Sequence, residues 1–99
     1  MTATLIVIYW RDIPAQVTAK GEASSARVQL SDRFQNAIDA AAMKAGLVEM
    51  DLYLEEWRQE ARSCEDDLEA EVASEVARLE AAYTRDVLLR LTRSGGHDT

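Results

Sequence analysis

The hydrophobic period of this chain changes once, near Ser31, from the two-residue repeat of strands to the three-to-four-residue repeat of helices. Before that point, Thr4–Trp10 is a continuous run of mostly β-branched, aliphatic and aromatic residues, which predicts a strand covered on both faces or nearly so. Ala15–Lys20 and Arg27–Leu30 instead alternate apolar and polar side chains. Residues 3–30 are therefore predicted to form a three-stranded antiparallel meander.

The first turn of this meander carries its least ordinary residues. The first strand ends in two aromatic residues and becomes polar at Arg11-Asp12, just before the only proline, Pro14. Because proline cannot donate a hydrogen bond to a ladder, Pro14 suits a turn or the entrance of a strand. Residues 21–25, Gly-Glu-Ala-Ser-Ser, predict the second turn.

The helical period predicts two short helices after the sheet. The first begins at Ser31, a good N-cap residue, and ends at Gly46. Its apolar stripe consists of Phe34, Ile38, Ala41 and Ala45. The second begins at Asp51, and the residues on its apolar face are Leu54, Trp57 and Ala61. These two helices are expected to cover the sheet.

A third, long C-terminal helix is predicted after a break at residues 63–67. Its apolar face consists of Leu68, Val72, Val76, Leu79 and Tyr83 and continues toward Leu91. This spacing is close to a heptad seam, so the helix is expected to protrude and to offer a surface for a homodimer. Residues 1–93 are predicted to be a single α+β domain. Residues 94–99, which include Gly95 and Gly96, are predicted to be a disordered tail.

The net charge of −7 is unevenly distributed. Residues 49–80 hold 12 acidic side chains against three arginines, a local balance of −9. Because acidic surfaces repel phosphate, neither a nucleic acid nor an anionic membrane is an expected partner. No apolar run approaches the roughly 20 residues that span a bilayer, and the first ten residues lack the features of a signal peptide. The expected location is the cytoplasm.

The chain lacks the residue types for most reactive centres. Cys64 is the only cysteine and His97 the only histidine, so no intramolecular disulfide and no cysteine-rich metal site are expected. A histidine in a frayed terminus does not support Ser-His-Asp or Cys-His catalysis. The acidic run at residues 65–67 radiates from a helix start and is expected to be solvated. The chain is therefore predicted to have no catalytic residues, no cofactor and no metal.

Seven residues are the candidate contact surface, and we call them the corner cluster: Tyr9, Trp10, Arg11, Asp12, Tyr53, Trp57 and Arg58. One interpretation is structural: the first four residues shape a hairpin corner, Tyr53 and Trp57 are core aromatics, and Arg58 lies at the rim of the core. A second is a partner-binding patch, because Trp, Tyr and Arg are the residue types that anchor interfaces. A third is a small-anion site in which Arg11 binds a carboxylate or phosphate.

Three segments of the chain, "VIYWRDIPAQV", "LSDRFQNAIDAAAMKAGL" and "DLYLEEWRQ", together resemble the bacterial virulence factor domain family. The resemblance covers residues 3–62, in order and with the expected separations. It implies no catalytic residue. Small stand-alone members are similar to proteins that accompany folate- and corrinoid-dependent methyl-transfer enzymes, which implies an accessory role in one-carbon or methionine metabolism.

The main hypothesis is a non-catalytic accessory or adaptor protein that binds a larger protein, such as a methyl-transfer or folate enzyme, through the corner cluster. One alternative is a small-ligand-binding enzyme subunit of one-carbon transfer, with Arg11 holding a carboxylate and Asp12 handling a proton. The other alternative is a homodimeric structural module that pairs through the long helix.

Overall fold

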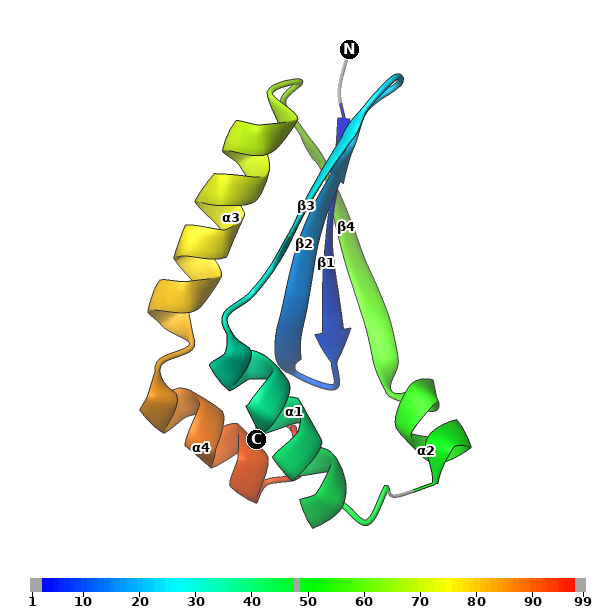
Figure 1. The fold of residues 1–99 in the computed structure, drawn as a ribbon, viewed down its shortest axis with the longest axis vertical. Coiled ribbons are helices and arrows are strands. Elements are labelled where there is room, and N and C mark those ends of the chain that lie inside the picture. The colour runs from blue at the N-terminus through cyan, green and yellow to red at the C-terminus, as the bar shows by residue number, and fades with distance from the viewer. Residues whose placement is uncertain (1–2, 48, 98–99) are drawn as a thin grey trace.

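The computed structural model describes residues 3–47 and 49–97. It is an α+β fold with four strands and four helices in the described residues (Figure 1). In chain order the elements are β1 (Ala3–Trp10), β2 (Ile13–Lys20), β3 (Ser25–Gln29), α1 (Asp32–Lys44), α2 (Met50–Glu55), β4 (Trp57–Cys64), α3 (Leu68–Ala82) and α4 (Arg85–Arg93).

The strands form one antiparallel sheet in the order β3-β2-β1-β4. The meander of β1, β2 and β3 confirms the sequence prediction, and Arg11-Asp12 is the turn between the first two strands. The register shifts between Ile8 and Tyr9 of β1, which pair with Gln16 and Pro14, so Ala15 is the extra residue of a bulge. Pro14 thus lies near the entrance of β2, as expected.

The prediction of only three strands is wrong, because Trp57–Cys64 forms β4 and not part of a second helix. β4 pairs with β1 along its whole length, from Ala3 opposite Cys64 to Trp10 opposite Trp57. This pairing satisfies the backbone hydrogen-bonding groups on the second edge of β1. The stabilisation comes from residues distant in sequence, so local helical spacing does not indicate it. The second helix is only the six-residue α2.

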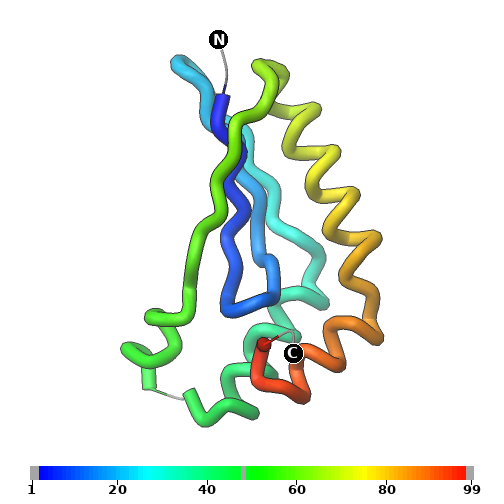
Figure 2. Tube along the Cα trace, turned by 180° about the vertical axis from the view of Figure 1, so that it is seen from behind, coloured from blue at the N-terminus to red at the C-terminus, as the bar shows by residue number. Residues whose placement is uncertain are grey.

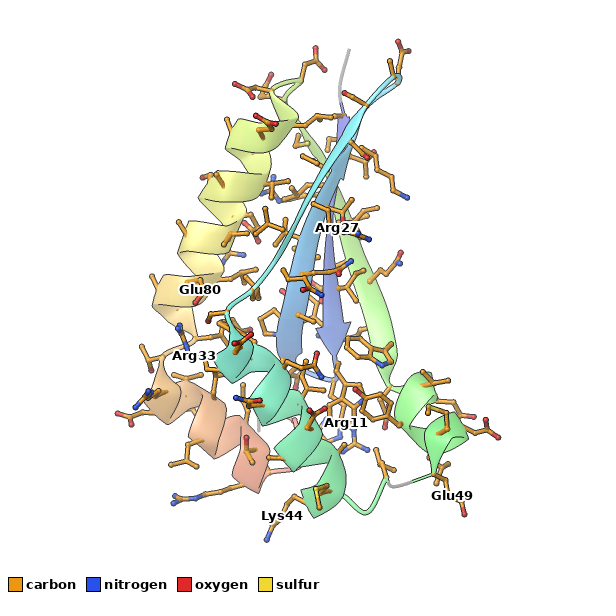
Figure 3. The ribbon with its side chains drawn as sticks, in the orientation of Figure 1. Arg11, Arg27, Arg33, Lys44, Glu49 and Glu80 are labelled. Carbon is orange, nitrogen blue, oxygen red and sulfur yellow. The ribbon has the colours of Figure 1, made fainter. Side chains whose placement is uncertain are left out.

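The prediction of one long C-terminal helix is also wrong, because the chain turns at Tyr83 and divides that segment into α3 and α4. Thr84 caps α4 by accepting a hydrogen bond from the amide of Val87 at 3.3 Å. Arg33 binds the end of α3, donating to the carbonyl of Glu80 at 2.8 Å, and Figure 3 shows these two side chains close together. The long helix therefore does not protrude.

The face of the sheet that carries Leu5, Val7 and Val17 is buried, and α3 packs against it. The expectation that the two short helices cover the sheet is thus wrong for α2, which has no buried residues. α1 packs on β2 and on α4, with Phe34 and Ile38 in the core. Three side chains of the predicted dimer seam are instead in the core of the monomer: Leu68, Val72 and Leu79.

Three glycines after helices α1 and α4 adopt the left-handed conformation: Gly46, Gly95 and Gly96. Gly46, predicted as the end of α1, has φ +77°, and its amide donates to the carbonyl of Met43 at 3.1 Å. Gly96 follows α4 and has φ +97°. Its carbonyl accepts a hydrogen bond from the amide of Asp12 at 2.9 Å, and Figure 2 shows this end of the chain below the turn between β1 and β2.

The predicted tail begins at residue 94, and the structure describes it as far as residue 97. Gly95 and Gly96 are both buried against the β1–β2 turn. Two glycines in sequence suggested flexibility, but here they allow a close approach of backbone to side chains. Residues 98 and 99 of the predicted tail lie outside the described residues.

We predict that Gly96→Ala destabilises the fold by about 2–4 kcal/mol, because a Cβ there would lie 2.8 Å from Cζ3 of Trp10. Gly46→Ala is the matched control: its φ is also positive, but no atom lies within 4 Å of the added Cβ. The control should cost about 1 kcal/mol from backbone strain alone. Urea unfolding measures both, and equal losses would contradict the close packing of Gly96 on Trp10.

Candidate functional site

The structure brings all seven residues of the corner cluster together. Pairing of β1 with β4 places Tyr9 opposite Arg58 and Trp10 opposite Trp57. Tyr53 comes from α2, four residues before the start of β4, and reaches the same place. The cluster closes the end of the sheet where the β1–β2 turn, α2 and the C-terminal glycines meet.

Trp10 is the buried centre of the cluster. It is 0% exposed, and its indole Nε1 donates a hydrogen bond to the carbonyl of Tyr53 at 3.0 Å. The two rings stack with 5.7 Å between centroids, and Tyr53 in turn meets Trp57 edge-on at 6.0 Å. These contacts fix α2 to the sheet. Trp10 is therefore a core residue in this structure and not an exposed anchor.

Arg11 joins three separate segments. Its Nε and one terminal nitrogen donate to Oε1 of Glu56 at 3.0 and 2.7 Å, and the other terminal nitrogen donates to the carbonyl of Gly95 at 2.8 Å. The guanidinium also lies 5.2 Å from the centroid of Trp10, a cation–π contact. With its side chain only 13% exposed, Arg11 serves the fold and does not present a free guanidinium.

Glu56 belongs to this site but is not among the seven residues of the corner cluster. Besides its carboxylate, its backbone carbonyl accepts a hydrogen bond from the amide of Arg11 at 3.0 Å. The available signal was a glutamate next to Trp57 in the segment "DLYLEEWRQ". That signal did not identify a partner for Arg11, because the partner depends on the pairing of β4 with β1.

Arg58 covers the outer side of the cluster. Its Nε donates to the carbonyl of Arg11 at 2.9 Å, and a terminal nitrogen lies 3.3 Å from the carboxylate of Asp12. It also pairs with Glu60, and its guanidinium lies 4.4 Å from the centroid of Tyr9. Burial raises the pKa of the Tyr9 hydroxyl, so this phenol stays protonated at neutral pH. The arrangement is an ion-pair network on an aromatic ring.

A second buried charge lies under α3. Glu75 is only 5% exposed, and Nε of Arg78 donates to it at 2.9 Å, while Arg62 of β4 approaches it at 3.4 Å. The hydrogen bond from Arg78 lowers the pKa of Glu75, against the opposing effect of burial. The sequence analysis placed no functional weight on Glu75, because an acidic residue in an acidic helix gave no sign of burial.

The remaining candidates for chemistry are the thiol of Cys64 and the acidic side chains. Burial raises the pKa of the Cys64 thiol, which disfavours the nucleophilic thiolate. Across residues 3–47 and 49–97, no group of three or more His, Cys, Asp or Glu side chains is arranged to hold a metal ion. In the same ranges, no helix is both long and apolar enough to cross a bilayer.

The most exposed apolar feature beside the cluster is α2. Met50, Leu52 and Leu54 are 68%, 43% and 53% exposed, and we call these three residues the α2 patch. Figure 1 shows α2 at the base of β4, set apart from α1 and α4. Met50 and Leu54 are four residues apart and share one side of α2, whereas Leu52 lies on another side of the helix.

These features define a small α+β protein with an antiparallel sheet, one face of which is packed on α3. The chain belongs to the virulence factor family, whose model matches residues 8–92 of its 99 residues. The match confirms the resemblance found in the sequence and extends it beyond residue 62 through α3 and most of α4. No curated protein and no solved structure matches the chain.

We predict that Arg11→Met and Glu56→Gln each destabilise the protein by about 1–3 kcal/mol, with the larger loss for Arg11, which also binds Gly95. The double variant should lose about 1–2 kcal/mol less than the sum of the single variants, because the two side chains share one ion pair. Denaturant unfolding of the four proteins measures this coupling. Additive losses would show that the pair does not stabilise the cluster.

Glu75→Gln should destabilise the protein by about 1–2 kcal/mol at neutral pH, because the carboxylate is buried beside two guanidiniums. A carboxyl whose pKa is lower in the folded state stabilises the fold above its ordinary pKa of 4.5, and this contribution disappears as the pH falls through the folded-state value. The difference between wild type and variant should therefore shrink below pH 4.5.

Unfolding free energies across this pH range measure the effect. Glu69→Gln, an exposed position on the same helix, is the control and should change stability by about 0.5 kcal/mol or less. A Glu75→Gln difference that stays constant on acidification would contradict the charged interaction.

Proposed function

We propose that this protein is a non-catalytic adaptor that docks the α2 patch into an apolar groove of a larger protein. The observation that supports this most directly is that α2 has no buried residue, although Tyr53 and Glu56 fix its C-terminal end to the sheet. A short helix held rigidly with its apolar side chains in water loses little conformational entropy when it binds.

The charges around α2 specify the chemistry of the groove. Residues 49–57 include four carboxylates, at Glu49, Asp51, Glu55 and Glu56, and no lysine or arginine. Among ion pairs between described residues, Glu56 is the one of these four carboxylates that has a close cation, Arg11. A partner groove with an apolar floor and a basic rim complements this surface. Partly buried Tyr53 and Trp57 and exposed Arg58 extend the same contact area beyond α2.

This proposal keeps the outer residues of the corner cluster as contacts and gives Trp10 and Arg11 a supporting role, since both are needed to hold α2. The resemblance to companions of folate- and corrinoid-dependent methyl-transfer enzymes makes such enzymes the first partners to test. Binding of a substrate carboxylate by Arg11 is disfavoured, because Glu56 and Gly95 engage its guanidinium.

The test is affinity capture from an extract of the source organism with Leu52→Ser/Leu54→Ser and with Leu89→Ser as matched control. Leu89 is similarly exposed at 49% but lies on α4. Wild type and control should recover the same larger protein, and the double variant should lose it by tenfold or more, because two apolar anchors are removed. Circular dichroism confirms folding of each variant.

Raising the salt concentration should also weaken the captured complex, because the proposed rim contacts are ionic. Equal recovery by the folded double variant would exclude α2 as the docking element. Recovery that is unaffected by salt would exclude the basic rim.

A further inference from the structure

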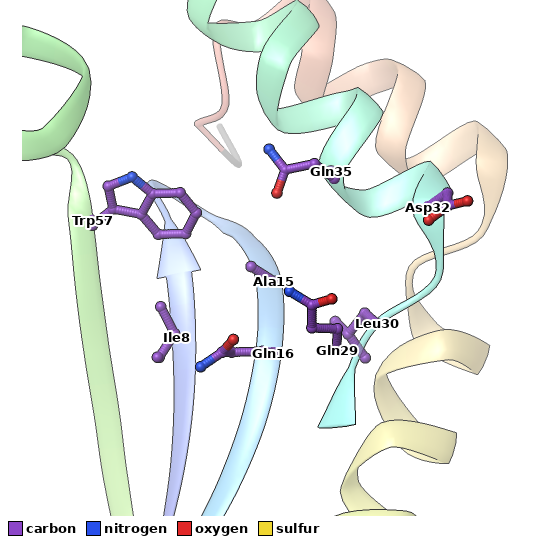
Figure 4. Close-up of a pocket in the computed structure, with 8 residues that line it drawn as sticks. All are labelled: Ile8, Ala15, Gln16, Gln29, Leu30, Asp32, Gln35 and Trp57. Atoms are coloured by element: carbon purple, nitrogen blue, oxygen red, sulfur yellow. The ribbon is translucent and has the colours of Figure 1, made fainter. Parts of the chain in front are cut away.

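A pocket of about 300 Å³ lies on the face of the sheet that α3 does not cover, where the sheet meets α1 (Figure 4). Successive residues of β1 alternate between the faces, so Leu5 and Val7 are buried under α3 while Ile8 faces the pocket. Ala15 and Leu30 complete an apolar floor. This volume is at the lower end of the range for small-molecule sites.

One wall of the pocket is an aromatic ring. Figure 4 shows the indole of Trp57 on β4, across the pocket from Gln35 of α1. The edge-on contact with Tyr53 at 6.0 Å already fixes the position of this indole. An aromatic face beside an apolar floor suits a flat ring, and stacking of a nucleic-acid base on such a face is worth about 1–3 kcal/mol.

The polar groups of the pocket are three amides, Gln16, Gln29 and Gln35, and one carboxylate, Asp32. Gln16 and Gln29 are direct partners in the pairing of β2 with β3, and Ile8 is opposite Gln16 on β1. Within the described part of the chain, no hydrogen bond engages the side-chain amide of Gln16 or Gln29. Each amide offers both donors and an acceptor, and no cation lines the pocket. This lining matches an uncharged ring with nitrogen and oxygen atoms at its edge.

The same face continues into a second hollow that shares Ile8 and Gln16 with the pocket and contains Lys20 and Arg27. Arg27 is opposite Thr18, two residues along β2 from Gln16, and Lys20 is two residues further. At strand geometry these cations lie about 7 and 14 Å from the glutamine pair. No acidic side chain lines this hollow, although the chain contains 18 Asp and Glu residues.

We propose that this face binds a small molecule consisting of a planar nitrogen heterocycle and an anionic tail. The ring stacks against Trp57 with its edge bonded to Gln16 and Gln29, and the tail extends along β2 to Arg27 and Lys20. A purine nucleotide and a pterin with a glutamate tail share this chemistry. The site includes none of the α2 patch and shares only Trp57 with the proposed docking surface. Its supporting observations do not depend on the proposed function.

The experiment titrates the intact protein with adenosine, AMP, folic acid and inorganic phosphate, followed by ¹H–¹⁵N spectra of the side-chain amides and indoles. AMP, folic acid or both should shift the signals of Gln16, Gln29 and Trp57, while buried Trp10 serves as an internal reference. Adenosine should bind about tenfold more weakly than AMP, because it lacks the anion. The tighter of AMP and folic acid identifies the source of the ring.

Two surface variants separate ring from tail. Arg27→Gln should weaken binding of AMP or folic acid about tenfold and leave adenosine unchanged, whereas Gln16→Leu/Gln29→Leu should weaken all three. Arg93→Gln on α4 is the matched control for loss of one exposed cation and should bind like wild type.

Three results would overturn the proposal. The first is that no ring-bearing probe shifts Trp57 at millimolar concentration. The second is that binding is the same in both variants and wild type. The third is that a short single-stranded oligonucleotide binds more tightly than AMP, which would make this face a nucleic-acid surface.

Discussion

The contacts of Arg11 hold together three parts of this molecule that are far apart in sequence. Its side chain bonds Glu56 after α2 and Gly95 after α4, while its own carbonyl accepts a hydrogen bond from Arg58 of β4. Arg11 adopts φ 52°, a left-handed conformation that costs a non-glycine residue about 1 kcal/mol. The ion pair and hydrogen bonds offset that cost, which explains why an arginine, and not a glycine, occupies the turn.

The parts of the fold that depend on local chemistry are visible in the sequence. The meander, the end of α1 at Gly46 and the Arg11-Asp12 turn follow from alternation, glycine and the position of Pro14. β4 is not visible in this way. Charged residues at positions 58, 60 and 62 alternate with a mixed set at positions 57, 59, 61 and 63, so neither face of the strand is clearly apolar. Its identity comes from pairing with β1, which no local pattern encodes.

In the corner cluster, too, residue types determine some features and tertiary pairing determines others. Aromatic and arginine content made Tyr9, Trp10 and Trp57 candidate residues, and the pairing of β1 with β4 places them at one end of the sheet. The content did not reveal that Trp10 and Arg11 face inward, because burial there is created by α2, Gly95 and Gly96, all distant in sequence. The break between α3 and α4 was missed for a related reason: the apolar spacing continues across Tyr83, and only the cap at Thr84 marks the turn.

The strand order also separates charge across the molecule. Acidic α2 adjoins β4 at one edge of the sheet, whereas Lys20 and Arg27 lie on β2 and β3 toward the other edge, on a hollow lined by no carboxylate. Ionic attraction between exposed groups fades over roughly 8–10 Å at physiological salt, so each edge acts on its own surroundings despite the net charge of −7. A basic-rimmed groove at α2 and an anionic tail at Arg27 therefore do not compete for the same charges.

Trp57 is the side chain that joins the two regions, since it lines the pocket and packs on Tyr53 of α2. Binding at one region influences the other only to the extent that it changes the position of this indole.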